Sequence, residues 1–332
     1  MIVGVRGGGV AAAACAHLLG AAGHRVAHEP APRPQVPSVM LSAAALALVR
    51  DVFGRSDLFA DRPRVTRRVV AWGGQEPVTV PHDAILVSDR DLHEALASDC
   101  PGADAGENRD FTIFTAPPMP EGELRVFGDR HAVAAQVALR DPAARGECRI
   151  EALPAGWLFL APGAEGQGWL LGFGAPLEEL VGQSRLVGPA IDLRAARSAP
   201  FVTAPRLHLP LAGAGWLACG TAALGFDPIC GDGTAQAVRE AVLASAVIDA
   251  AAGGADRAAL LAHYQAMLVA AMRRHLQLCA RFYETGGQGE WWRAQSAALA
   301  RGHALCTAYL AREPEPRFVL RGFRLEPRAL AA

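Results

Sequence analysis

The 332-residue sequence contains no lysine, so all 32 of its basic residues are arginines. No step of its chemistry can therefore use a lysine amine as a Schiff base, a general base or a halogen carrier. The sequence has no run of about 18 consecutive apolar residues, so it predicts no membrane-spanning helix. The formal net charge is -1, which gives the chain no overall field to attract nucleic acid or an anionic membrane.

The seven cysteines form no C-x-x-C pair, and no group of cysteines and histidines has the sequence spacing of a metal site. We therefore expect no metal. Scattered cysteines of odd number fit a reducing cytosol better than a disulfide scaffold, which predicts a cytoplasmic protein. Hydrophobic residues make up 51% of the chain and charged residues 20%, which is typical of a globular protein with a substantial core.

The N-terminus shows the pattern of a strand, a glycine turn, a helix and a second strand. "IVGV" at 2–5 predicts a buried strand, and "RVAHE" at 25–29 predicts a strand that ends in an acid. Between them, Gly7, Gly9 and Ala12 have the G-x-G-x-x-A spacing of a dinucleotide fingerprint. Gly9 would let a pyrophosphate approach the helix amides, and Glu29 would accept hydrogen bonds from a ribose. This loop alone does not separate FAD from NAD.

A second glycine loop, "GFDPICGDGTAQAVREAV" at 225–242, permits two interpretations. Its centre, CGDGT, is similar to the loop with which methyltransferases bind S-adenosylmethionine. That loop directly follows a strand, whereas here Pro228 stands where the strand should be, and proline is excluded from central strands. The strand predicted at 216–220 ends instead at Gly220. The sequence therefore favours a flavin loop over a methyltransferase loop.

The stretch 216–245 resembles the second FAD motif of the flavin-dependent monooxygenases and halogenases of the p-hydroxybenzoate hydroxylase fold. It is similar to the tryptophan-halogenase-like and peptidyl-tryptophan-modifying flavoproteins. The resemblance implies that the loop amides and the next helix face the flavin pyrimidine. The positions that match this motif are Gly220, Thr221, Asp227, Pro228, Gly231, Gly233 and Thr234. Cys230 is expected beside the flavin ring.

Other segments extend the resemblance and also depart from it. "LVSDRDLHEAL" is similar to the family's R-x-x-L helix, which implies that Arg90 lies near the cofactor pyrophosphate. The family's Asp in the second motif is Thr221 here, which brings no charge, so the resemblance implies a weakly held FAD. "RVFGDR" at 125–130 is expected to be the remnant of the family's D-A-T-G strand. The family's halogenases need an active-site lysine, which argues against halogenation by this chain.

The predicted fold is α/β, with a Rossmann-like FAD-binding domain, an inserted β-sheet substrate domain and C-terminal helices. We expect the FAD-binding domain to comprise residues 1–64, 82–110 and 205–255. The substrate domain would comprise 65–81 and 111–204, and the helical region 256–332.

The resemblance implies an FAD-dependent monooxygenase that acts on an aromatic or indole-like substrate, either free or within a peptide, through a flavin C4a-hydroperoxide. Electrons would come from transiently bound NAD(P)H or from a separate flavin reductase, because only one dinucleotide fingerprint is present. Two alternatives remain: a flavin oxidase or dehydrogenase on the same fold, and a non-redox member that binds a partner. The residues expected to line the substrate pocket are Trp157, Phe159, Trp169 and His208. The catalytic candidates are His208 and Cys230.

Overall fold

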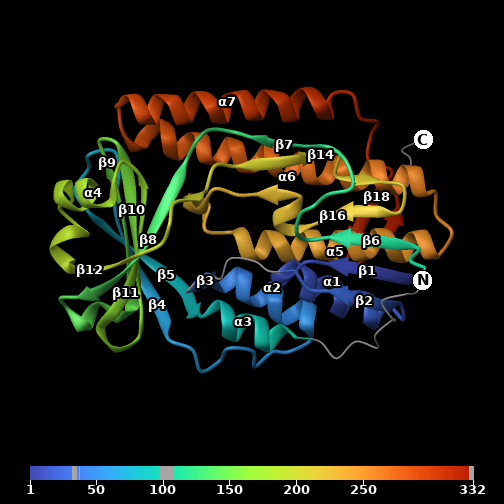
Figure 1. Ribbon diagram of the computed structural model, residues 1–332, viewed down its shortest axis with the longest axis horizontal. Helices are drawn as coiled ribbons and strands as arrows, with labels where there is room; N and C mark the ends of the chain where they lie inside the picture. The colour runs from blue at the N-terminus through green and yellow to red at the C-terminus, as the bar shows by residue number, and fades with distance from the viewer. Residues whose placement is uncertain (32–35, 37, 98–107, 329–332) are drawn as a thin grey trace.

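The computed structural model describes residues 1–31, 36, 38–97 and 108–328, and shows an elongated α/β molecule (Figure 1). One end contains a five-stranded sheet in the order β15-β16-β6-β1-β2. Strand β6 pairs in parallel with β1 on one side and with β16 on the other. The strands are β1 (Ile2–Arg6), β2 (Arg25–Glu29), β6 (Phe111–Phe114), β15 (Ala212–Gly213) and β16 (Trp216–Ala218).

Helices α1 (Gly9–Ala21) and α5 (Gly233–Ala252) pack against this parallel sheet and against each other. The small residues of α1 allow this close approach, because Ala11, Ala12 and Ala14 are all buried. α2 (Ala43–Phe53) begins where Ser42 accepts a hydrogen bond from the Ala45 amide, and it ends at Gly54 in the left-handed region. α3 (Asp89–Leu96) begins at a similar cap, Ser88.

The other end of the molecule contains a nine-stranded sheet whose main path runs β12-β8-β11-β10-β9-β4-β5-β3, with β13 (Phe201–Val202) paired to β8. A short helix, α4 (Leu177–Gln183), packs on it over a separate small core. The strands are β3 (Val39–Ser42), β4 (Arg64–Ala71), β5 (Val78–Val87), β8 (His131–Leu139), β9 (Glu147–Leu153), β10 (Gly156–Pro162), β11 (Gln167–Gly174) and β12 (Ile191–Arg197).

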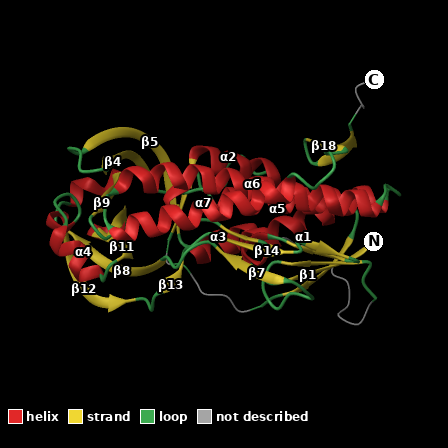
Figure 2. Ribbon diagram, turned by 90° about the horizontal axis from the view of Figure 1, so that it is seen from above, coloured by secondary structure: helices red, strands yellow, loops and turns green. Residues whose placement is uncertain are grey.

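A small sheet of β17 (Leu224–Gly225), β14 (Arg206–Leu209) and β7 (Glu123–Val126) lies beside the parallel sheet (Figure 1). Two long helices, α6 (Arg257–Gly286) and α7 (Glu290–Leu310), then run along the molecule and cover both ends (Figure 2). The hairpin of β18 (Phe318–Arg321) and β19 (Arg324–Pro327) follows. None of the helices in the described ranges is long and apolar enough to cross a membrane.

The fold class is as predicted, with some differences along the chain. The strand next to β1 is Phe111–Phe114, so this segment lies in the parallel sheet and not in the β-rich sheet. The segment 125–130, expected to be the remnant of the D-A-T-G strand, contributes the end of β7, which pairs with β14. The strand at 111–114 was not predicted because residues 101–123 are rich in glycine, proline and acids, which is typical of a surface loop. The hairpin β18–β19 was not foreseen within the helical C-terminal region.

Candidate functional site: two glycine loops and a cavity

The first glycine loop connects β1 to α1 in a conformation that only glycine adopts easily. Gly7 has φ of +119° and Gly9 has φ of +80°. A Cβ at Gly7 would lie 2.3 Å from Thr115 Oγ1 at the end of β6. Helix α1 begins at Gly9 without a side-chain cap, so its first amides have no side chain to accept from them. The loop therefore presents free donors of the kind that bind a phosphate.

Glu29, at the end of β2, lies between two arginines. Its Oε2 is 3.0 Å from Arg6 Nε, and Arg109 donates a hydrogen bond to Oε1. The hydrogen bond from Arg109 is the main reason why the pKa of Glu29 is lowered, and the charge of Arg6 adds to it. The side chain remains 36% exposed, so the carboxylate is ionised and its remaining lone pairs are accessible.

The segment Gly220–Thr221, just before the second glycine loop, contacts α1 and Thr115 beside the first loop. Gly220 has φ of +61°, and a Cβ there would lie 2.7 Å from the Ala11 Cβ. Thr221 is exposed, and its hydroxyl donates to the carbonyl oxygen of Thr115 at 3.4 Å. Thr115 thus lies against both Gly7 and Thr221. The fold brings together two loops that are more than 200 residues apart in the sequence.

Glu240 on α5 is hydrogen-bonded to the backbone of Gly220. Its Oε2 accepts the Gly220 amide at 2.7 Å, and its Oε1 accepts from Gln236 Nε2 at 3.1 Å. The side chain is buried, and this burial raises its pKa to about 8 despite the two hydrogen bonds. No sequence pattern singled out this residue, since an acid inside a helix ordinarily faces solvent.

Helix α5 also begins without a side-chain cap. The turn η5 (Pro228–Cys230) leads to Gly231, which has φ of +63°, and then to the first helical residue, Gly233. Asp232 precedes the helix but pairs with Arg239 at 2.6 Å instead of capping the first turn. Two uncapped helix N-termini at glycine loops are donors suited to the pyrophosphate and the ring of a flavin dinucleotide. The residues present therefore fit FAD.

Asp227 anchors η5 through a buried network. Its Oδ2 lies 2.9 Å from Arg130 Nε and accepts a hydrogen bond from the Tyr283 hydroxyl at 3.0 Å. Its backbone amide donates to His275 Nε2 at 2.7 Å. Burial raises the pKa of Asp227, while the nearby Arg130 charge opposes that rise. Burial, with a further contribution from Arg130, lowers the pKa of His275 to about 3, so its ring is neutral.

A cavity of about 560 Å³ opens between η5, α6 and the β3–β5 edge of the large sheet. Its lining combines cationic and apolar side chains. Arg68 donates toward His82 Nε2 across 3.1 Å on one wall. The cations are Arg68, Arg239 and Arg274, and the wall at η5 and α6 includes Phe226, Cys230 and His275.

The structure brings most of the expected cofactor residues together at the N-termini of α1 and α5. Gly7, Gly9 and Ala12 lie at the start of α1, and Gly220 and Thr221 lie beside them. Asp227, Pro228, Gly231, Gly233 and Thr234 form the turn and first helical residues of α5. Arg90 is 80% exposed and pairs with Glu94 at 2.7 Å, so its partner here is a residue of its own helix.

The four expected pocket residues do not line this cavity. Trp157 is buried, stacks on Phe173 at 3.7 Å and donates toward the Tyr283 hydroxyl. His208 is buried with its Nδ1 2.9 Å from the Pro210 carbonyl oxygen, the contact of a structural histidine. Phe159 and Trp169 are half-buried strand residues of β10 and β11. Their role as a substrate surface stays a prediction.

Several residues of the site had no signal in the sequence. Arg130 and Asp227 are 97 positions apart, and only the tertiary fold brings their side chains together. Sequence spacing also predicted no cysteine–histidine cluster, whereas the structure groups Cys230, His275 and Cys279. The four-residue spacing of His275 and Cys279 places both on one helix face, and it could have indicated half of this cluster.

Comparison with known proteins finds matches by structure. No protein-family model and no curated protein sequence matches the chain. The flavin-dependent halogenase CmlS superposes with a TM-score of 0.75 at 18% identity, covering 94% of this chain and 71% of CmlS. The peptidyl tryptophan dihydroxylase QhpG, essential for tryptophylquinone cofactor biogenesis, has a TM-score of 0.73 at 20% identity, covering 98% and 86%.

A third similar structure is PqsL, a probable FAD-dependent monooxygenase from Pseudomonas aeruginosa. It has a TM-score of 0.63 at 18% identity and covers 94% of this chain and 97% of its own. All three similarities extend over nearly the whole chain, including both sheets and the C-terminal helices. The expected resemblance is confirmed: this protein has the fold of the FAD-dependent halogenases and monooxygenases.

Proposed function

We propose that the protein is an FAD-dependent monooxygenase that acts on an aromatic or indole-like substrate, either free or within a peptide. The observation that supports this most is the contact of two glycine segments at Thr115: Gly7, whose loop opens the uncapped helix α1, and Gly220–Thr221. The chain continues from Gly220–Thr221 to η5, which opens the uncapped helix α5 at the edge of the cavity. A single phosphate site would need only the first of these segments. Together they fit a cofactor that is long enough to span from Glu29 to η5.

Each part of this site has a separate task. Glu29 accepts hydrogen bonds from the ribose of the cofactor, and the first amides of α1 bind its pyrophosphate. The first amides of α5 face the ring, where they stabilise negative charge. Bound FAD, once reduced, supplies the electrons that activate molecular oxygen. The cavity walls orient the substrate and limit its contact with water.

The electron source is a further part of the proposal. One dinucleotide fingerprint occurs in the chain, and the residues that form it are those assigned to FAD. NAD(P)H would then bind transiently, or a separate flavin reductase would supply the electrons. Halogenation is disfavoured because the chain has no lysine to carry an oxidised halide. A flavin oxidase is the second candidate, since the same two loops would serve it.

The absorbance spectrum between about 300 and 550 nm tests the cofactor assignment. Purified protein, incubated with FAD and freed from excess, should show flavin bands that heat or acid releases. If bands are retained, incorporation of labelled oxygen from O2 into a product, dependent on NAD(P)H or a reductase, distinguishes a monooxygenase from an oxidase. Absence of any bound flavin at saturation would contradict the proposal and favour a non-redox protein.

Thr221 offers a sharper test of FAD affinity. We expect Thr221→Asp to lower the Kd for FAD by about tenfold, because a carboxylate forms stronger, charge-assisted hydrogen bonds with ribityl hydroxyls than a threonine does. The side chain is exposed, so the change should cost little stability. Fluorescence titration measures the effect. Thr221→Asn is the matched control, because asparagine has the shape of aspartate without its charge. Equal Kd values for all three proteins would contradict the role of this position.

A further inference from the structure

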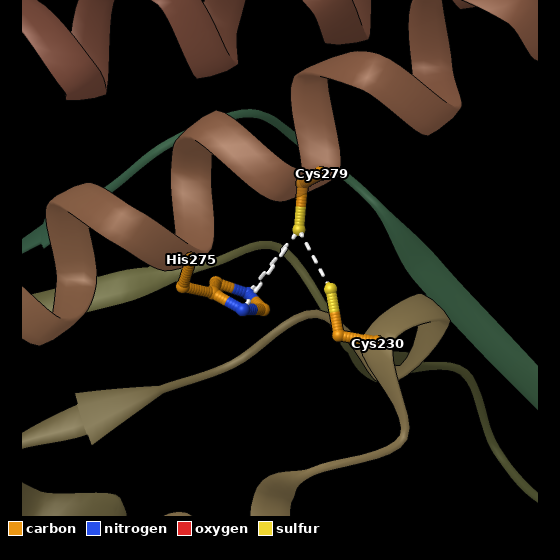
Figure 3. Close-up of side chains that lie close together, drawn as sticks. All are labelled: Cys230, His275 and Cys279. Carbon is orange, nitrogen blue, oxygen red and sulfur yellow. Dashed lines mark hydrogen bonds between the residues drawn. The ribbon is translucent and has the colours of Figure 1, made fainter.

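The side chains of Cys230, His275 and Cys279 form a compact cluster of two sulfur atoms and one imidazole (Figure 3). Cys230 comes from η5, while His275 and Cys279 come from successive turns of α6. The two sulfur atoms are 3.5 Å apart, and Cys279 Sγ lies 3.4 Å from His275 Nε2. In Figure 3 the sulfur atom of Cys279 points toward both of the other side chains.

The two cysteines differ in their access to solvent. Cys230 is half-buried and lines the 560 Å³ cavity. Cys279 is fully buried, and it does not line the cavity. A small molecule that enters the cavity therefore meets the sulfur of Cys230 first. Cys279 is in van der Waals contact behind it, so any sulfur species formed at Cys230 has a second thiol within reach.

A metal ion is the first alternative for such a cluster. Zinc bound by two thiolates at about 2.3 Å in a tetrahedron would separate the sulfur atoms by a distance close to the one observed. However, His275 Nε2 already accepts the buried amide of Asp227 at 2.7 Å. A metal at Nε2 would leave that buried amide without a partner, which is unfavourable because its lost hydrogen bond to water is not replaced.

The imidazole is also held in place. It stacks on Phe226 with ring centroids 3.9 Å apart, so it cannot turn toward a metal without losing this contact as well. No fourth ligand accompanies the three residues within the part of the chain that the structure describes. The geometry therefore favours chemistry between the two sulfur atoms over a metal site.

We propose that Cys230 and Cys279 are a redox-active thiol pair that forms a reversible disulfide when a peroxide enters the cavity. The Cys230 sulfur attacks one oxygen of hydrogen peroxide, which gives a sulfenic acid and water. The Cys279 sulfur then attacks the Cys230 sulfur, and the hydroxyl group leaves as a second water with the proton of Cys279. In total, two thiols and one hydrogen peroxide give one disulfide and two water molecules.

The required movement is small. A disulfide has an S–S distance of about 2.05 Å, so the sulfur atoms must approach by about 1.5 Å, which rotation of the side chains can supply. The disulfide would tie η5 to α6 covalently. Because η5 leads into α5, oxidation would fix the loop that the proposed function places at the flavin ring. The thiol chemistry itself does not depend on that function.

The chain contains a matched internal control. Cys15 on α1 and Cys219 at the end of β16 have their sulfur atoms 4.0 Å apart, and both residues are fully buried. Neither residue lines the cavity. The two sulfur atoms of this pair are almost as close together as those of Cys230 and Cys279, but a molecule in the cavity cannot reach them. Peroxide should therefore leave this pair unchanged in the folded protein. A comparison of oxidation at the two pairs therefore shows whether access from the cavity, and not only the distance between the sulfur atoms, determines which thiols react.

The experiment is a peroxide titration of the intact wild-type protein. After treatment, free thiols are alkylated, and unreduced peptides are mapped by mass spectrometry. We expect the loss of two thiols per chain, a linked peptide that joins Cys230 and Cys279, and complete reversal by dithiothreitol. Cys279→Ser should give no link and should leave Cys230 as a sulfenic or sulfinic acid, whereas Cys15→Ser should form the link as wild type does.

Other results would overturn the proposal. One is stoichiometric zinc or copper in the purified protein that shields Cys230 and Cys279 from alkylation until a chelator removes it. Another is a linked peptide at Cys15 and Cys219, or overoxidation of Cys230, without any link to Cys279 in wild type. Since the peptide map of wild-type protein decides the matter, the test does not depend on whether the variants fold.

Discussion

Arg130→Met should lower the free energy of unfolding by about 3–5 kcal/mol, the usual cost of removing one partner of a buried ion pair. The Arg130 and Asp227 side chains are 0% and 1% exposed. Arg130 also donates to Gln295 Oε1 at 2.8 Å and lies over the Tyr283 ring at 4.7 Å. Methionine keeps much of the volume but leaves the Asp227 carboxylate without its cation. Urea denaturation at pH 7 measures the loss.

Two controls separate the charge from the packing. The double variant Arg130→Met/Asp227→Asn should recover part of the loss, because no buried charge remains unpaired. Arg64→Met breaks an exposed pair with Asp83, in which the side chains are 57% and 53% exposed, and should cost no more than about 1 kcal/mol. Equal losses for Arg130→Met and Arg64→Met would contradict the importance that we give to the buried pair.

The Arg130→Met deficit should also depend on pH. Burial already raises the pKa of Asp227, and loss of the nearby guanidinium removes one cause that opposes this rise. At low pH the carboxyl is protonated in the variant, so the unpaired charge disappears and the deficit shrinks. A deficit that stays constant from acidic to neutral pH would indicate that lost packing, not lost pairing, causes it.

Glu240 should make the stability of the wild-type protein fall as the pH rises through the neutral range. Its pKa is about 8 in the folded protein, against 4.5 ordinarily. The folded state therefore holds a proton that the unfolded state has released, so the free energy of unfolding decreases between about pH 4.5 and pH 8. At about 1.4 kcal/mol per pKa unit, the loss is on the order of 5 kcal/mol.

Glu240→Gln should remove this pH dependence. Glutamine cannot ionise, and Gln236 can turn its amide so that both hydrogen bonds are kept. Denaturation of both proteins at pH 5, 7 and 8.5 measures the difference, which should grow with pH in favour of the variant. Glu94→Gln, at a side chain that is 60% exposed, is the control and should behave as wild type does. Parallel stability curves for wild type and Glu240→Gln would contradict the prediction.

The sequence was informative where function depends on the backbone. Glycine spacing and the placed acid identified both loops, because a turn with positive φ restricts residue choice at particular positions. One proline, Pro228, favoured a flavin loop over a methyltransferase loop at 225–242. The structure confirms the fold class that these motifs implied, and both Gly7 and Thr221 contact Thr115.

The sequence was less informative where function depends on side chains from distant elements. Arg130 could not be paired with Asp227, nor Cys230 with Cys279, because periodicity and spacing carry no information on long-range contacts. Trp157 shows the same limit for a single side chain. Trp157 was expected at a substrate pocket because aromatics often line such sites, yet it is stacked in the core against Phe173. Composition alone does not separate these two roles.

The C-terminal helices have a mechanical consequence. α6 has 30 residues and so is about 45 Å long, a length that lets one rigid rod touch both ends of the molecule. Near its start, Tyr264 bonds to the Ala218 carbonyl oxygen beside the parallel sheet; near its end, the Phe282 carbonyl accepts from Trp72 on the large sheet's side. Opening a hinge between the two sheets would break these contacts, so α6 favours a fixed distance between them. We therefore expect a ligand to reach the cavity through its existing opening.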